Sequence, residues 1–193
     1  GLSVLYSLIT FAITQPLADK LGKKEWCCWG AGFAAAVFAL LFFFPIHNPV
    51  LFIVINGVCY LGASGMQVLI WAMVNDSIDY HELQTGERNE GIVYSTYSFF
   101  RKLASAVSGS LSSFVLGFIG YNVAEGAMQT AEVSNAIWKS YTGIYVLGYG
   151  VAVAILFFVY PLTKAKTTEM LEQLKARRAE KASAVETDGE QCP

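Results

Sequence analysis

Five long apolar runs limit what this chain can fold into more than any other feature of its sequence. They are separated by short polar stretches and occupy residues 2–16, 26–44, 50–74, 92–119 and 141–162. A helix needs about 20 residues to cross the roughly 30 Å hydrocarbon core of a bilayer. Four runs reach or approach that length, and the first is shorter. The sequence therefore predicts an all-α integral membrane protein with five helices, of which the first is truncated.

The composition excludes most soluble functions. The chain is 54% hydrophobic and only 15% charged, whereas a soluble domain carries about 25% charged residues. This balance argues against a disordered chain and against a nucleic-acid partner, and it makes the lipid bilayer the expected environment. No phosphate-binding loop, zinc signature or Ser–His–Asp arrangement stands in the sequence, so a membrane enzyme is the weakest alternative. We expect no cofactor and no resident metal.

The basic residues predict the orientation of the chain in the membrane. One set of alternate connections contains ten of the 13 Lys and Arg residues and comprises 17–25, 75–91 and 163–193. The opposite connections contain only Lys139. By the positive-inside rule the first set faces the cytoplasm, so the chain starts outside and ends inside.

We divide the chain into a membrane domain, 1–163, and a cytoplasmic tail, 164–193. Within the tail, apolar residues recur at helical spacing among charged ones, at Met170, Leu171 and Leu174. Such a helix either lies on the membrane surface or is solvated, and we expect disorder after about Ser183. The short first run and the absence of an initiator Met predict that the chain is cut within its first span.

The run at 92–119 carries positive charge where lipid is expected. As a helix it places Lys102 about 15 Å from its cytoplasmic end, near the bilayer centre, where an unpaired charge costs at least about 2.5 kcal/mol. The Lys102 face of this helix is small and polar, with Ser95, Ser98, Ser105 and Ser113. Either Lys102 pairs with a carboxylate on another helix, or it faces a water-filled cavity and contacts a polar substrate or a coupling ion. The serine lining favours the cavity.

Arg101 points about 100° away from Lys102 on a helical wheel. A structural partner or the lipid surface is nearly as good an explanation for this residue as a substrate.

The run at 50–74 offers two more candidate substrate residues at a matching depth, Gln67 and Trp71. An amide beside an indole is suited to a sugar, because the amide hydrogen-bonds hydroxyls while the indole covers the C–H face. The alternative is that Gln67 packs between helices and that Trp71 belongs to the aromatic belt of the membrane interface.

The connection at 75–91 is strongly acidic. It holds five carboxylates against Arg88 alone: Asp76, Asp79, Glu82, Glu87 and Glu90. We consider three interpretations, namely a solvated charge run, an unspecific metal site that would include His81, and half of an ionic gate whose basic partners lie on a domain outside this chain.

Two blocks of the sequence resemble a known family. Pro-Leu-Ala-Asp-Lys-Leu-Gly-Lys-Lys at 16–24 resembles the cytoplasmic loop signature of major facilitator transporters. The block from Asp76 to Lys102, with Thr-Gly-Glu-Arg-Asn-Glu-Gly and Ser-Phe-Phe-Arg-Lys, resembles the glycoside–pentoside–hexuronide:cation symporters. Melibiose and glucuronide permeases are members, and Tyr-Pro-Leu-Thr at 160–163 looks more like the glucuronide branch.

This resemblance implies the C-terminal half of a major facilitator fold, whose twelve spans hold the substrate between two halves. It implies a bacterial inner-membrane location and a missing N-terminal half that contains the main site of the coupling cation, Na⁺ or H⁺. In the sugar pocket it places Tyr97, Ser98, Arg101 and Lys102, with Gln67 on the facing helix. It assigns inner gating charges to Asp76, Asp79 and Arg88.

The function predicted from the sequence is secondary active transport of a glycoside or hexuronide sugar by alternating access. One alternative is a truncated, non-transporting remnant or accessory subunit. Another is transport of a lipid-like substrate, which would require an apolar lateral opening rather than a serine-lined cavity.

Overall fold

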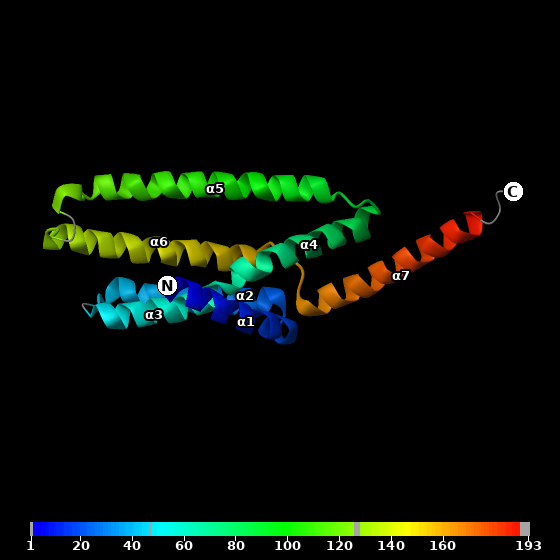
Figure 1. Ribbon diagram of the computed structural model, residues 1–193, viewed down its shortest axis with the longest axis horizontal. Helices are drawn as coiled ribbons and strands as arrows, with labels where there is room; N and C mark the ends of the chain where they lie inside the picture. The colour runs from blue at the N-terminus through cyan, green and yellow to red at the C-terminus, as the bar shows by residue number, and fades with distance from the viewer. Residues whose placement is uncertain (1, 47, 126–127, 190–193) are drawn as a thin grey trace.

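The computed structural model describes residues 2–46, 48–125 and 128–189 (Figure 1). Every regular element in these ranges is helical, which confirms the predicted all-α class. The elements are α1 (Leu2–Leu21), α2 (Lys23–Phe43), α3 (Pro49–Ala63), α4 (Gly65–Thr85), α5 (Glu90–Phe118), the 3₁₀ turn η1 (Val123–Glu125), α6 (Ala131–Phe158) and α7 (Lys164–Gly189).

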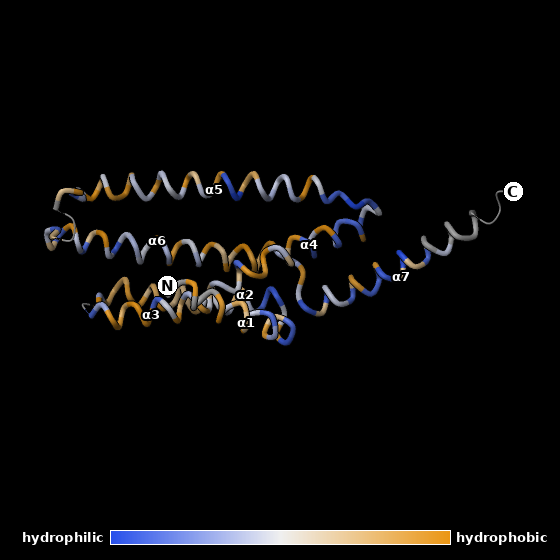
Figure 2. The backbone as a smooth tube through the Cα atoms, viewed as in Figure 1, coloured by the Kyte–Doolittle hydropathy of each residue, from blue (hydrophilic) through white to orange (hydrophobic). Residues whose placement is uncertain are grey.

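The central helix of the bundle is α2, which packs against α6 and α3. Helix α5 runs alongside α6 on the side away from α1, α2 and α3, and α4 crosses obliquely to reach it (Figure 1). Helix α7 leads away from the bundle towards the C-terminus. Figure 2 shows that hydrophobic residues dominate α2, α3 and α6, whereas the outer end of α4 is hydrophilic.

Three helical stretches are long and apolar enough to cross a membrane, by length and composition, within the part of the chain that is described. They are Lys23–Phe43, Pro49–Thr85 and Ala131–Phe158. Helix α5 has 29 residues, which is ample length, but Arg101, Lys102 and its serines lower its hydropathy. The expectation of five spans therefore stays a prediction for α1 and α5.

The apolar run at 50–74, which we expected to form one span, is divided at Ser64. The Ser64 hydroxyl is hydrogen-bonded to the Thr10 hydroxyl of α1 (3.0 Å) and to the Leu61 carbonyl (3.2 Å). Helix α3 ends here and α4 begins at Gly65. A side-chain hydroxyl that bonds a nearby backbone carbonyl competes with the regular backbone hydrogen bonds of a helix. The run is therefore interrupted at Ser64, a position that its hydropathy does not distinguish.

Helix α4 continues to Thr85, so most of the acidic stretch expected as a connection is helical. It ends at Gly86, whose φ of +79° is left-handed and whose N–H bonds the Glu82 carbonyl. Glycine adopts this conformation without the steric penalty of a Cβ atom. Likewise α1 and α2 are separated only by Gly22, at φ +108°.

Two apolar clusters hold the bundle together. The first joins α2 and α3 through Ala34, Phe38, Leu41, Cys59 and Ala63. Helix α6 packs against it through Trp138, whose indole N–H donates to the Leu41 carbonyl at 2.8 Å. The second joins α1, α2 and α4 through Ala18, Cys27, Leu69 and Met73. No residue of α5 is buried among those described, so α5 is fixed mainly by its contacts with α4.

The tail forms one helix, α7, which continues past Ser183 to Gly189. We expected disorder after Ser183, but residues 184–189 are helical. Residues 190–193, the rest of that expectation, lie outside the described ranges. Met170 and Leu174 are buried, at 3% and 2% exposure, and α7 packs against α4. Met170 and Leu174 therefore contact protein, and the position of α7 on the membrane surface or in solvent stays a prediction.

A close helix crossing gives a test of this packing. A Cβ atom at Gly30 would overlap the carbonyl oxygen of Gly62, whereas a Cβ at Gly32 would meet nothing within 4 Å. We expect Gly30→Ala to lower the free energy of unfolding by about 1–3 kcal/mol, the usual cost of overpacking. Gly32→Ala is the matched control and should leave stability unchanged or raise it slightly. Thermal unfolding in detergent measures both, and equal effects would contradict the crossing.

Candidate functional site

A groove between α4 and α5 brings together most of the substrate residues predicted from the sequence. It has a volume of about 460 Å³ and is lined by Trp71 from α4 and by Tyr97, Ser98, Arg101, Lys102 and Ser105 from α5. These α5 residues recur in steps of three and four, as adjacent pairs, so they share one side of the helix. The groove therefore combines aromatic rings, hydroxyls and two cations.

Aromatic contacts position the two walls of the groove. The Trp71 ring lies 5.0 Å from the Tyr97 ring at 67° and 6.0 Å from the Tyr94 ring at 40°. The Tyr94 hydroxyl also hydrogen-bonds the Asn75 side chain of α4. Sequence reasoning missed Tyr94, although its spacing of three residues from Tyr97 indicates a shared face. Trp71 is still 44% exposed, so part of its indole remains available to a ligand.

The two cations of the groove are exposed and form no ion pair with any residue that the structure describes. Pairing of Lys102 with a carboxylate, the structural alternative considered above, is thus not found in the described part of this chain. Arg101 was expected to point away from Lys102, but both line the groove. The Arg101 side chain is long enough to bend back towards the groove, although its Cα–Cβ bond points about 100° away from that of Lys102. A helical wheel shows only the direction of the Cα–Cβ bond.

Gln67 does not lie in this groove. It lines a neighbouring hollow of about 670 Å³ between α4, α5 and α6, together with Ser108, Ser112, Tyr145 and Tyr149. Gln67 precedes Trp71 by one turn of α4, and Ser108 follows Ser105 on α5, so the two hollows are neighbours along the same pair of helices. The tyrosines of α6 were also missed, although Tyr141, Tyr145 and Tyr149 recur every four residues.

A cluster of charges surrounds the end of α4. Arg88 donates to Asp79 Oδ1 at 2.6 Å and to Glu82 Oε2 at 2.8 Å, and it also pairs with Glu90. Arg178 of α7 contacts the same two α4 carboxylates. Hydrogen bonds to Glu82, Asp79 and Glu90 hold the pKa of the Arg88 guanidinium above its ordinary value. It therefore stays cationic at any working pH.

Asp76, the third predicted gating charge, belongs to a separate ion pair. Its carboxylate is buried, and the Lys23 ammonium from the start of α2 donates to both of its oxygens at 2.8 and 2.7 Å. Arg88 thus pairs with Asp79 but not with Asp76. In this structure Lys23, Arg88 and Arg178 of the same chain pair with these acids. That further basic partners lie on a domain outside this chain stays a prediction.

Comparison with known proteins decides the family of this chain. A family model described as MFS/sugar transport protein matches residues 1–164. The chain belongs to this family. An uncharacterized symporter of Bacillus subtilis, YjmB, is 35% identical over 169 residues, which cover 87% of this chain and 36% of the relative.

Two further relatives carry named substrates. A glucuronide carrier protein homolog of Escherichia coli is 28% identical over 92% of this chain and 39% of its own length. An isoprimeverose transporter of Lactiplantibacillus pentosus is 33% identical over 90% of this chain and 36% of its own length. The chain therefore spans little more than a third of the length of these relatives.

These relatives confirm the resemblance to glycoside–pentoside–hexuronide:cation symporters. They are transporters rather than enzymes, and together with the apolar helices they identify this family member as a multi-pass membrane protein.

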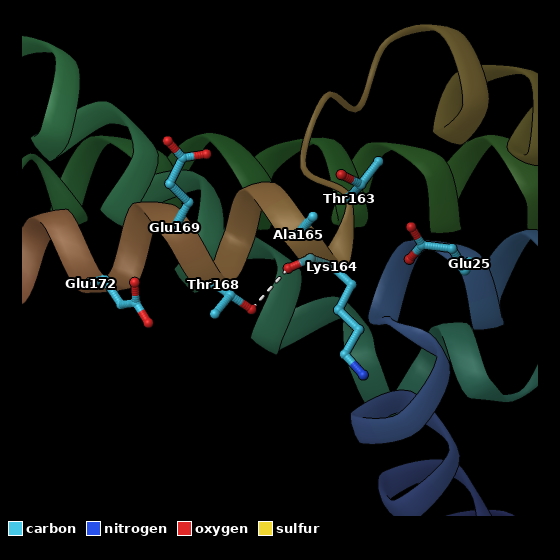
Figure 3. A pocket seen from close by; sticks show the side chains of 7 residues that line it. All are labelled: Glu25, Thr163, Lys164, Ala165, Thr168, Glu169 and Glu172. Carbon is cyan, nitrogen blue, oxygen red and sulfur yellow. Dashed lines mark hydrogen bonds between the residues drawn. The ribbon is translucent and has the colours of Figure 1, made fainter.

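A third hollow lies where α2 begins and α7 begins (Figure 3). It measures about 660 Å³, and Glu25, Lys164, Glu169 and Glu172 contribute its charges. Figure 3 shows Lys164 reaching towards α1, where its ammonium donates to the Lys20 carbonyl at 2.7 Å. Across the described ranges, no group of three or more His, Cys, Asp or Glu side chains could hold a metal ion.

The Lys23–Asp76 pair gives a second test. We expect Asp76→Ala to lower the free energy of unfolding by about 1–2 kcal/mol, because the Lys23 ammonium loses its carboxylate while 33% of its side chain still reaches solvent. The matched control is Asp19→Ala, since Asp19 is exposed and forms no ion pair among the residues described. Thermal or denaturant unfolding of both purified variants measures the difference. An equal effect of the two substitutions would show that the pair adds nothing.

Proposed function

We propose that this chain contributes part of the substrate site of a cation-coupled sugar symporter, and that the groove between α4 and α5 holds the sugar. One observation carries the proposal: five residues selected from the sequence as substrate contacts line a single groove, and its two cations lack a carboxylate partner among the described residues. A groove built only for packing would have no reason to keep two charges unpaired in an apolar region, where they are costly.

The chemistry of the groove suits a hydroxylated or anionic sugar. The exposed part of Trp71 can cover the C–H face of a sugar ring, and the Ser98 hydroxyl can bond to ring hydroxyls. Arg101 and Lys102 can bind hydroxyl oxygens or a carboxylate, and charge-assisted bonds of this kind are the stronger ones. The glucuronide carrier homolog supports an anionic substrate, because a glucuronide bears a carboxylate.

The coupling ion would be Na⁺ or H⁺, with its main site in a part of the transporter outside this chain. The acids of α4 support this division, because Asp76, Asp79 and Glu82 are already held by Lys23, Arg88 and Arg178. Lys102 would then face both the sugar and the carboxylates of the cation site. Alternating access would expose the groove to each side in turn, with the Asp79–Arg88 and Asp76–Lys23 pairs controlling the cytoplasmic side.

The test is Lys102→Ala in the complete transporter. We expect concentrative sugar uptake to fall about 30-fold or more, because losing a charge-assisted bond to the substrate costs about 2 kcal/mol. Membrane insertion should be unchanged. Uptake of labelled glucuronides and pentosides into cells measures the effect.

The matched control is Lys139→Ala, which removes an exposed lysine of α6 outside the groove and should keep normal uptake. Normal uptake by Lys102→Ala would refute the role of the groove. If the native membrane protein contains no more than this chain and takes up no sugar, it is a remnant or an accessory subunit.

A further inference from the structure

The C-terminal helix reaches the same acids that we assign to the cytoplasmic gate. Arg178 of α7 contacts Glu82 Oε2 at 2.6 Å and Asp79 Oδ1 at 3.2 Å, and its Nε donates to Glu82 Oε1 at 3.2 Å. The preceding residue, Arg177, donates to the Leu83 carbonyl at 2.7 Å. Two consecutive arginines of the tail therefore bind both the side chains and the backbone of the last turns of α4.

Arg178 and Arg88 contact the same carboxylate oxygen atoms. Both guanidiniums contact Asp79 Oδ1, and both contact Glu82 Oε2. With this coverage each of the two acidic side chains is only 16% exposed. A cation arriving from another part of the transporter would therefore have to displace one of these arginines.

Apolar contacts keep α7 in place while Arg178 makes these bonds. Met170 and Leu174 are buried, at 3% and 2% exposure. At the start of the helix, Lys164 is tied to the Lys20 carbonyl of α1. Arg178 follows Leu174 by one helical turn, so the burial of Leu174 directs the guanidinium towards α4.

We propose that Arg178 is a further positioning residue of the cytoplasmic gate, and that docking of α7 competes with closure of that gate. This inference rests on the proposed transport function. While α7 is docked, Arg178 holds Asp79 and Glu82 and withholds them from basic residues elsewhere in the transporter. When α7 leaves, Arg88 alone faces three carboxylates, which are then free to recruit those cations and close the cytoplasmic side.

The competition predicts a direction for the effect on transport. Without Arg178 the population of the cytoplasm-closed state increases, so the substrate site faces outwards for a larger fraction of the time. We expect Arg178→Ala to lower both the KM for external sugar and the maximal uptake rate by about threefold, the size of effect typical of an exposed ion pair. A purely structural brace would lower the amount of folded protein without lowering KM.

The experiment uses the complete transporter with Leu174→Cys as a reporter of docking. Its modification by a maleimide is located by mass spectrometry, and Glu172→Cys, at an exposed position of the same helix, gives the undocked rate. Into the Leu174→Cys background we would introduce Arg178→Ala, Arg178→Lys as the conservative rescue, and Lys175→Ala as the matched control, because Lys175 is exposed and makes no ion pair with a described residue.

Support requires faster labelling at 174 and lower KM in Arg178→Ala, partial restoration of both by Arg178→Lys, and no change in Lys175→Ala. Faster labelling with unchanged KM and rate would overturn the gate role and leave α7 a brace. If the parent is labelled at 174 as fast as at 172, docking of α7 is refuted. Docking is also refuted if residue 174 is protected in anionic lipid vesicles but not in neutral ones, because the arginines would then bind lipid. Absence of uptake by the parent would refute the proposed function and the gate role together, while unchanged KM beside normal parental uptake would refute the gate role alone.

Discussion

A charge in the middle of a membrane-spanning helix has to be hydrated, paired or bound by a ligand, and α5, which we predict to span the membrane, carries two such charges side by side. Burying an unpaired cation in hydrocarbon costs several kcal/mol, so the protein around it has to supply water or an anion. Among the described residues no carboxylate reaches Arg101 or Lys102. The groove with Trp71 and Tyr97 is the local consequence of this constraint, because it keeps the charged side of α5 open.

At the C-terminal end of α4 the charges are paired, which explains why the helix extends so far beyond its apolar part. Asp76, Asp79 and Glu82 would repel one another along a single helix face, since they recur at spacings of three residues. Cations from α2, from the connection after α4 and from α7 remove that repulsion. Three segments far apart in the sequence are thereby tied to one helix, and the helix can continue to Gly86.

Features that depend on local residue spacing could be predicted from the sequence. Features that depend on contacts between residues far apart in the chain could not. Apolar runs indicated the helices, and the polar face around Lys102 indicated most of the groove, because both follow from residue spacing alone. The break at Ser64 depends on a hydroxyl bond to Thr10, and the position of Gln67 depends on the packing of α6. The partners of Asp76 and Asp79 lie 53 and 99 residues away, at Lys23 and Arg178. No periodicity reports such pairs.

Helix α4 connects the groove mechanically to the ion cluster around Asp79 and Glu82. Trp71 forms a wall of the groove, and Asp79 begins the shared ion cluster two turns later, about 12 Å along the helix axis. A single helix without a break between them moves both ends together, because its hydrogen bonds resist stretching and bending. A sugar that shifts Trp71 would therefore shift Asp79 and Glu82 relative to Arg88 and Arg178. Conversely, a tail that holds those acids restrains the wall against which we propose that the sugar rests.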